Sequence, residues 1–236
     1  MTLLSILLLG LLLGMKHALE ADHIAAVASL ATRHTQVADV VRQGVVWGMG
    51  HTLTLMIVCG GVLLIGAALP ARFAQGLEIG VGVMLVGLGG EVLWRLTRER
   101  IHFHAHRHDG HLHMHAHSHK NEGKHKYSLH RHEHLIPFRP LAVGMMHGLA
   151  GSAALVILSL EMIQSPVWGM AYVALFGVGS IAGMGALSVI IAIPLRYSAT
   201  YLTHAHRFLN VGVGMATVLI GAHLIYRIAV TGHILT

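Results

Sequence analysis

The chain consists largely of long apolar segments, and this feature constrains its fold more than any other. A helix needs about 20 apolar residues to cross a bilayer. Only 11% of the 236 residues are charged, whereas 54% are hydrophobic, and soluble domains carry about 25% charged residues. The sequence therefore predicts an all-α integral membrane protein. Its six predicted transmembrane helices are residues 2–31, 44–69, 75–96, 140–164, 167–195 and 208–230.

The two halves of the chain resemble each other in sequence. Residues 14–19 are similar to 144–149, 48–50 to 177–179, and 78–83 to 210–215, at offsets of 129 to 132 residues. Each half holds three predicted helices, an odd number, so the second half must cross the membrane in the opposite orientation. Inverted repeats of this kind are common in transporters. The sequence thus predicts two inverted three-helix repeats, residues 1–96 and 137–236, joined by a loop of residues 97–136.

The central loop is rich in histidine. It holds 13 of the 22 histidines of the chain. This composition cannot build an apolar core, so we expect the loop to be disordered without metal. Neutral imidazole binds nickel, zinc, copper and cobalt, which favours a metal-buffering role over the alternative of a pH-sensitive polar linker. The histidines assigned to buffering are His102, His104, His106, His108, His111, His113, His115, His117 and His119.

Basic residues predict how the chain is oriented in the membrane. The loops after the first, third and fifth helices carry most of the arginines and lysines, whereas the opposite side has only Arg72 and Arg227. The positive-inside rule then places the central loop in the cytoplasm and both termini outside a cell (inner) membrane. The net charge of +6 thus reflects membrane flanks and the loop, and no nucleic-acid partner is expected. Residues 1–13 lack the basic start of a signal peptide, so cleavage is not expected.

Five ionisable residues interrupt the first apolar segment: Lys16, His17, Glu20, Asp22 and His23. A charge near the centre of a membrane helix costs at least about 2.5–3.5 kcal/mol, and such groups are functional by default. Imidazole and carboxylate also ligate divalent transition metals, so we expect a metal site here. The alternative is internal ion pairing, such as Lys16 with Glu20. His17 and Asp22 lie about 140° apart on a straight helix, so either the helix is broken near residues 14–21 or some of these side chains face a second helix.

Two more histidines lie in later apolar segments. His51 follows Gly50, and His147 occupies the repeat position of His17. We include both in the metal site, with hydrogen-bonded packing as the alternative for His51 and a tight helix crossing or a pore-lining position for His147. Weaker candidates are Glu78, Glu91, Glu161, Asn210 and His223.

The segment from His17 to His23 resembles the His-x4-Asp-His signature of the nickel/cobalt transporter family. Gly50-His51-Thr52 and residues 144–152 are similar to motifs of its shorter six-helix relatives, the urease-accessory-type nickel permeases. The resemblance implies that His17, Asp22 and His23 recognise the ion during transport, with His51 contributing from the next helix. Glu20 departs from the family pattern, because larger members commonly have Asp there.

These observations predict a divalent metal permease for Ni2+, or for Co2+, with no prosthetic group and no enzymatic activity. The motif resemblance favours import slightly over efflux. A membrane metalloenzyme and a non-transporting metal buffer are the other classes considered. The single Cys59 leaves no Cys-based zinc site. Expected partners are a divalent metal ion and the lipid bilayer, and a cytoplasmic metallochaperone or accessory subunit is a further candidate.

Overall fold

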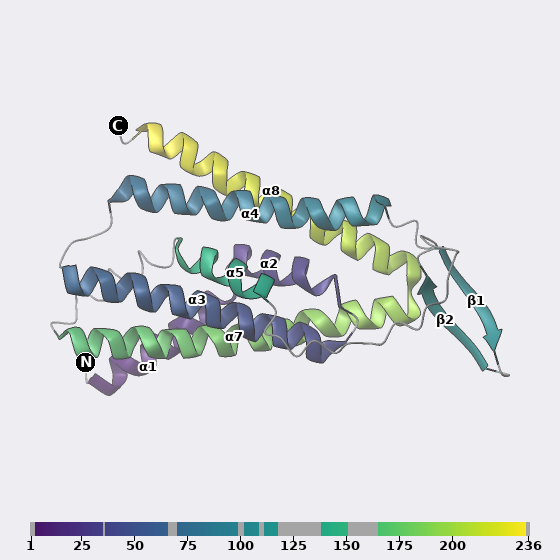
Figure 1. The fold of residues 1–236 in the computed structure, drawn as a ribbon, viewed down its shortest axis with the longest axis horizontal. Coiled ribbons are helices and arrows are strands. Elements are labelled where there is room, and N and C mark those ends of the chain that lie inside the picture. The colour runs from purple at the N-terminus through teal and green to yellow at the C-terminus, as the bar shows by residue number, and fades with distance from the viewer. Residues whose placement is uncertain are drawn as a thin grey trace.

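The fold is a bundle of long helices with a short hairpin at one end (Figure 1). The computed structural model describes residues 3–34, 36–65, 70–98, 102–108, 111–117, 138–150 and 165–234. The helices are α1 (Leu3–His17), α2 (Ala21–Ala31), α3 (Val37–Ile65), α4 (Ala71–Arg98), α5 (Phe138–Gly148), α7 (Pro166–Tyr201) and α8 (Thr203–Ile234). The strands are β1 (His102–His108) and β2 (His111–His117).

In the part of the chain that the structure describes, four helices are long and apolar enough to cross a membrane by themselves: α3, α4, α7 and α8. The pair α1 and α2, bent by 55° at a short break, makes a fifth candidate when taken as one span. An α-helical, multi-pass membrane protein is thus confirmed. The predicted fourth helix begins with α5, and most of its remainder, residues 151–164, lies outside the described residues.

The fifth predicted helix is longer than the sequence suggests. We expect it to end at Leu195, after Pro194, but α7 continues through Pro194 to Tyr201, so this predicted end is wrong. Proline leaves a backbone carbonyl without its helical partner, and neighbouring helices and hydroxyl side chains can satisfy such a group in membrane helices. The carbonyl that lacks its partner here is that of Ile190, four residues before Pro194. One turn after the proline, the hydroxyl of Ser198 donates a hydrogen bond of 2.9 Å to the carbonyl oxygen of Leu195.

Glycines let helix pairs pack backbone against backbone. A Cβ atom at Gly14 would lie 2.0 Å from the carbonyl oxygen of Phe176, and one at Gly144 would lie 2.0 Å from that of Trp47. The first contact joins α1 to α7, and the second joins α5 to α3. Small residues at such crossings allow the close approach by which helices associate in lipid.

Helices α4 and α8 also pack closely through glycines, at two positions. A Cβ atom at Gly89 would lie 2.6 Å from the carbonyl oxygen of Gly214, and one at Gly221 would lie 2.6 Å from that of Gly82. Figure 1 shows these two helices side by side along one edge of the bundle. The buried core beneath them includes the fully enclosed side chains of Trp47, Leu85 and Met184.

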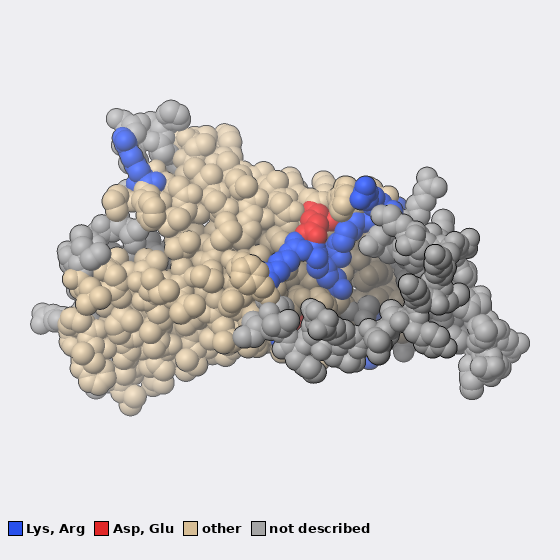
Figure 2. Space-filling model, in the orientation of Figure 1, with Lys and Arg blue, Asp and Glu red and all other residues tan. Residues whose placement is uncertain are grey.

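Charged side chains gather at the hairpin end of the bundle. Glu91 of α4 accepts hydrogen bonds from Arg33, which follows α2, and from Arg139 in the first turn of α5. Burial, together with the neighbouring cations Arg139 and Arg95, lowers the pKa of Arg33 to about 10, so it stays charged at neutral pH. In Figure 2, most of the lysine and arginine side chains visible on this face lie in the half nearer the hairpin, around a group of acidic atoms.

The hairpin lies within the loop for which composition predicts disorder. β1 and β2 pair antiparallel, from His102 with His117 to His108 with His111. The residues between the strands are Asp109 and Gly110, the dipeptide typical of two-residue hairpin turns. This turn signal, and the strict alternation of histidine with other residues, favour strands where composition alone does not. Disorder of the loop as a whole stays a prediction.

The glycine contacts predict how the bundle responds to added methyl groups. We expect Gly144→Ala to lower the free energy of unfolding by about 1–3 kcal/mol, because overpacking forces the α5 and α3 backbones apart. The matched control is Gly87→Ala on α4, where a Cβ atom would meet nothing within 4 Å. This control should be neutral or stabilising by up to about 1 kcal/mol, the helix propensity gain of alanine over glycine. Thermal unfolding in detergent, followed by circular dichroism, measures both, and equal midpoints would contradict the close packing.

Candidate metal centre

The break between α1 and α2 brings two histidines together. α1 ends at His17, and α2 begins after Glu20, whose backbone is extended. On a straight helix at about 100° per residue, His17 and His23 would point about 120° apart. The break removes this constraint, and their ring centroids lie 4.3 Å apart. Both are buried, with 4% and 1% of their surface exposed. A broken first helix was one of the two arrangements that the sequence left open.

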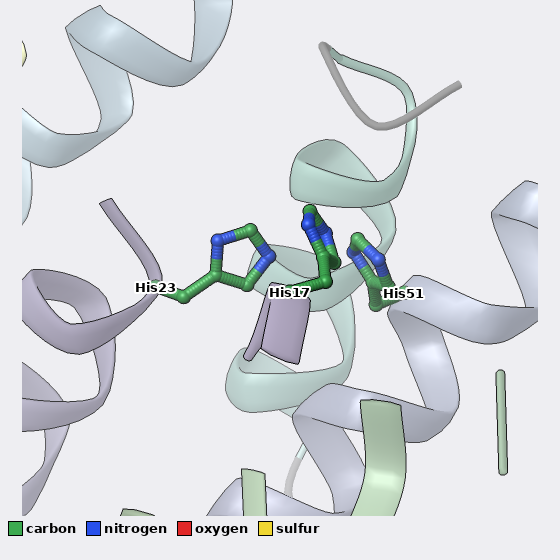
Figure 3. Close-up of side chains that lie close together, drawn as sticks. All are labelled: His17, His23 and His51. Carbon is green, nitrogen blue, oxygen red and sulfur yellow. The ribbon is translucent and has the colours of Figure 1, made fainter. Parts of the chain in front are cut away.

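His51 completes the group from α3. It is fully buried, and its ring centroid lies 5.2 Å from that of His17 and 5.4 Å from that of His23. One ligand nitrogen from each of the three rings lies within 4.8 Å of the others. Figure 3 shows the three imidazoles side by side. We call these three residues the histidine triad.

Carboxylates hold the outer nitrogens of two triad rings. Nδ1 of His17 lies 2.9 Å from Oε1 of Glu20, and Nδ1 of His23 lies 2.8 Å from Oδ1 of Asp22. A carboxylate accepts, so each Nδ1 carries the proton and donates it. Nε2 of both neutral rings then keeps its lone pair. Carboxylates that fix the tautomer and orientation of metal-binding histidines in this way are typical of metal sites.

His147 of α5 joins the cluster through the same aspartate. Its Nε2 lies 2.9 Å from Oδ2 of Asp22, and its ring centroid lies 4.2 Å from that of His23. Asp22 therefore bridges a histidine of the first half and one of the second. Asp22, His23 and His147 also form a second group whose ligand atoms lie within 4.8 Å of one another. His23 belongs to both groups.

Several ring nitrogens of the cluster are buried without a hydrogen-bond partner. Among the described residues this holds for Nε2 of His17 and His23, both nitrogens of His51, and Nδ1 of His147. Leaving a buried donor or acceptor unsatisfied costs about 1–3 kcal/mol. A divalent transition metal that binds the lone pairs of these imidazole nitrogens would remove this energetic cost. The buried nitrogens are therefore suited to such an ion.

Aromatic side chains wall the cluster. The ring of Trp47 lies 5.3 Å from His23 and 5.4 Å from His147, and the ring of Phe176 lies 5.4 Å from His17, measured between centroids. An apolar wall of this kind limits solvent access to a metal site. Sequence reasoning missed both residues. The signal that could have pointed to them is in the repeat, because Trp47 precedes Gly48 and Phe176 precedes Gly177 at an offset of 129 residues.

The structure brings together all six metal-site residues expected from the sequence. Glu20 is the most exposed of them, at 47% of its side chain. The weaker candidates lie elsewhere: Glu91 binds the arginines at the hairpin end, Asn210 lies 3.0 Å from His206, and His223 is exposed. Of the nine loop histidines that we assigned to metal buffering, eight lie in β1 and β2. His119 and Glu161 lie outside the described residues.

Together these features define a multi-pass helical membrane protein with a buried histidine cluster at a broken helix. No family model and no solved structure matches the chain. It is 32% identical over 230 residues to the urease accessory protein UreH of Bacillus sp. (strain TB-90), an alignment that covers 97% of this chain and 94% of that protein. The chain belongs to the family of this urease accessory protein. That relative is named as accessory to an enzyme, which agrees with the expectation that this protein is not an enzyme.

The unpartnered nitrogens predict a conflict between stability and metal binding at His51. Replacing His51 with the apolar leucine should raise the unfolding temperature of the metal-free protein, because it removes two unsatisfied polar atoms from the interior. It should also abolish the rise in unfolding temperature caused by a divalent transition metal. Unfolding in detergent, with a chelator or with excess metal, measures both effects. A His51→Leu protein that is less stable without metal, or still stabilised by it, would contradict this role.

Proposed function

We propose that this protein is a permease that carries Ni2+, or Co2+, into the cytoplasm through the histidine triad. The observation that carries the proposal is the convergence of unpartnered imidazole nitrogens inside a membrane bundle. The UreH relationship supports nickel in particular, since that relative is accessory to urease and the sequence motifs resemble nickel permeases. The ion is the cargo of the site, not a resident cofactor.

In this proposal the triad replaces water ligands of the ion as it enters. Nε2 of His17, Nε2 of His23 and one nitrogen of His51 bind it, because each of the three rings offers a nitrogen within 4.8 Å of the others and these nitrogens have no competing partner among the described residues. Neutral ligands bind less tightly than thiolates or several carboxylates would, and a transport site must release its ion as well as admit it. Glu20 and Asp22 act from outside this set and orient the rings.

Asp22 and His147 give the ion a second position. Because His23 belongs to both groups, a shift of α5 relative to α2 changes the ligand set around His23 without unfolding either helix. Asp22 would then serve as a direct ligand, the role that the family resemblance gives it. Movement of one half against the other in this way is the alternating-access mechanism expected of inverted repeats.

Paired contacts support the proposed architecture of six transmembrane helices in two inverted repeats. The contact of α1 with α7 through Gly14 has a counterpart in the contact of α5 with α3 through Gly144, and the four residues involved match at the repeat offset. The ends of α1 and α5 match too. Leu19 and Glu20 donate backbone hydrogen bonds to residues three earlier, and Leu149 and Ala150 do the same after α5.

The arrangement of the ends supports the proposed orientation, with the central loop cytoplasmic and the termini outside. Both chain ends lie at the end of the bundle opposite the hairpin in Figure 1. Most basic groups visible in Figure 2 lie toward the hairpin end, as the positive-inside rule requires of a cytoplasmic face. Histidines of the loop would then receive ions on the cytoplasmic side and buffer them.

Nickel uptake by cells tests the proposal. Cells that express the wild type should accumulate radiolabelled Ni2+ above the empty-vector level, and His17→Ala should abolish this because it removes one of three ligands. The control is His223→Ala, which removes an exposed histidine of α8 and should leave uptake unchanged. Depletion below the vector level, restored by His17→Ala, would instead establish an exporter. No difference among the strains would overturn the permease.

A second prediction concerns Asp22, whose carboxylate bonds to two histidines. Asp22→Asn should raise the KM for nickel uptake by about 10–100-fold, the usual effect of losing an outer partner of metal ligands. The matched control is Asp39→Asn, because Asp39 is an exposed carboxylate in the first turn of α3. Size-exclusion chromatography confirms that the variants fold. An unchanged KM for Asp22→Asn would contradict the orienting role.

A further inference from the structure

The antiparallel register of β1 and β2 pairs histidine with histidine at every second position. The four pairs are His102 with His117, His104 with His115, His106 with His113, and His108 with His111. The pairs between them are Phe103 with Ala116, Ala105 with Met114, and Arg107 with Leu112. Directly paired residues share a face of the ribbon, as do residues two apart on a strand. One face therefore carries eight histidines, and the other carries five apolar residues and one arginine.

The spacing within this face suits metal chelation. Directly paired residues have Cβ atoms about 4.5–5.5 Å apart. Residues two apart on a strand are separated by about 6.8 Å, twice the rise of 3.4 Å. Two adjacent pairs thus set four histidines at the corners of a small rectangle. Four ligands at about 2.0–2.1 Å complete the tetrahedral shell of an ion such as zinc, and imidazole also suits copper, iron and nickel.

We propose that the hairpin holds two four-histidine sites for divalent first-row transition-metal ions. The outer site consists of His102, His104, His115 and His117, and the turn site consists of His106, His108, His111 and His113. This inference rests on the proposed metal-handling function. It gives the hairpin a defined stoichiometry of two ions. In this proposal, metal binding depends on the register of the two strands and not only on the histidine content of the loop.

Register decides whether such sites exist. A slip of one residue would place each histidine opposite a residue other than histidine, because side-chain faces alternate with a period of two. The sequence Asp109-Gly110 between the strands favours the two-residue turn that this register requires. A two-stranded hairpin alone is only marginally stable in water, so ion binding at cross-strand sites stabilises the hairpin as it forms.

A variant of unchanged composition tests the role of register. Three neighbouring pairs in β2 are exchanged: His111 with Leu112, His113 with Met114, and His115 with Ala116. This keeps every residue type and the chain length but moves three histidines to the opposite face. Equilibrium dialysis of the purified full-length protein against Ni2+ should show one fewer bound ion than the wild type, because the turn site loses two ligands. The ion of the outer site, which loses only His115, should bind at least roughly tenfold more weakly. Unchanged stoichiometry and affinity would overturn the proposal.

Two double variants test the division into an outer and a turn site. His104→Ala with His115→Ala removes two ligands of the outer site, so one ion should be lost and the other should bind with unchanged affinity. His104→Ala with His113→Ala removes one ligand from each site. Both ions should then bind at least roughly tenfold more weakly, since even the loss of an outer partner costs about that much. Identical titrations of the two variants would overturn the division.

The hairpin sites and the permease fail in different ways. Hairpin ions are counted by binding to the purified chain, whereas the permease is measured as His17-dependent uptake by cells. If the chain binds two ions in a register-dependent way but shows no such uptake, the hairpin proposal stands and the permease proposal fails. A chain with uptake whose binding ignores the exchange in β2 retains the permease and loses the hairpin sites.

Discussion

The structure depends on one interruption of backbone hydrogen bonding, between His17 and Ala21. Irregular backbone at membrane depth requires that its polar groups be satisfied within the protein. Here Leu19 and Glu20 donate to the carbonyl oxygens of Lys16 and His17, at 2.9 and 3.0 Å. The interruption is therefore stable, and it turns two histidines of one segment toward the same interior space. Without it, His17 and His23 could not face His51 together.

The carboxylates of the first segment hold the histidine side chains that the helix break brings together. Asp22 accepts from the ring of His23 and bonds to the ring of His147, and Glu20 accepts from the ring of His17. These bonds account for charges that would otherwise be costly in an apolar segment. They also leave Nε2 of His17 and Nε2 of His23 without a hydrogen-bond partner among the described residues, in a group of three rings whose ligand nitrogens lie within 4.8 Å of one another. A single set of contacts thus explains both why the charges are tolerated and how the candidate metal centre is organised.

Close packing holds the partners of this centre in place. α3 and α5, which supply His51 and His147, meet at Gly144 and Trp47, and α1 meets α7 at Gly14 and Phe176. The aromatic residues at these two crossings are the same ones that wall the cluster. The same contacts therefore pack the helices and line the candidate metal centre. A change at either crossing would move the candidate ligands relative to one another.

Much of the site could be predicted from the sequence, because rare polar residues in apolar segments are individually recognisable. His17, Asp22, His23, His51 and His147 were all predicted as members of a metal site, and the structure places them together. The membrane class followed from composition. The sequence could not decide which nitrogens are free and which are held by carboxylates, since that depends on side chains from three helices meeting in space.

From the sequence alone, the chain is recognisable as a membrane protein, and its first segment must either be broken or face a partner helix. Both follow from local quantities, namely apolar length and angular spacing. The tertiary structure shows that both arrangements occur, because the segment is broken after His17 and Asp22 bonds to a histidine 125 residues away in another helix. It also pairs histidine with histidine in the hairpin. The reason is physical: helix crossings and strand register are fixed by contacts between segments that are distant in the chain.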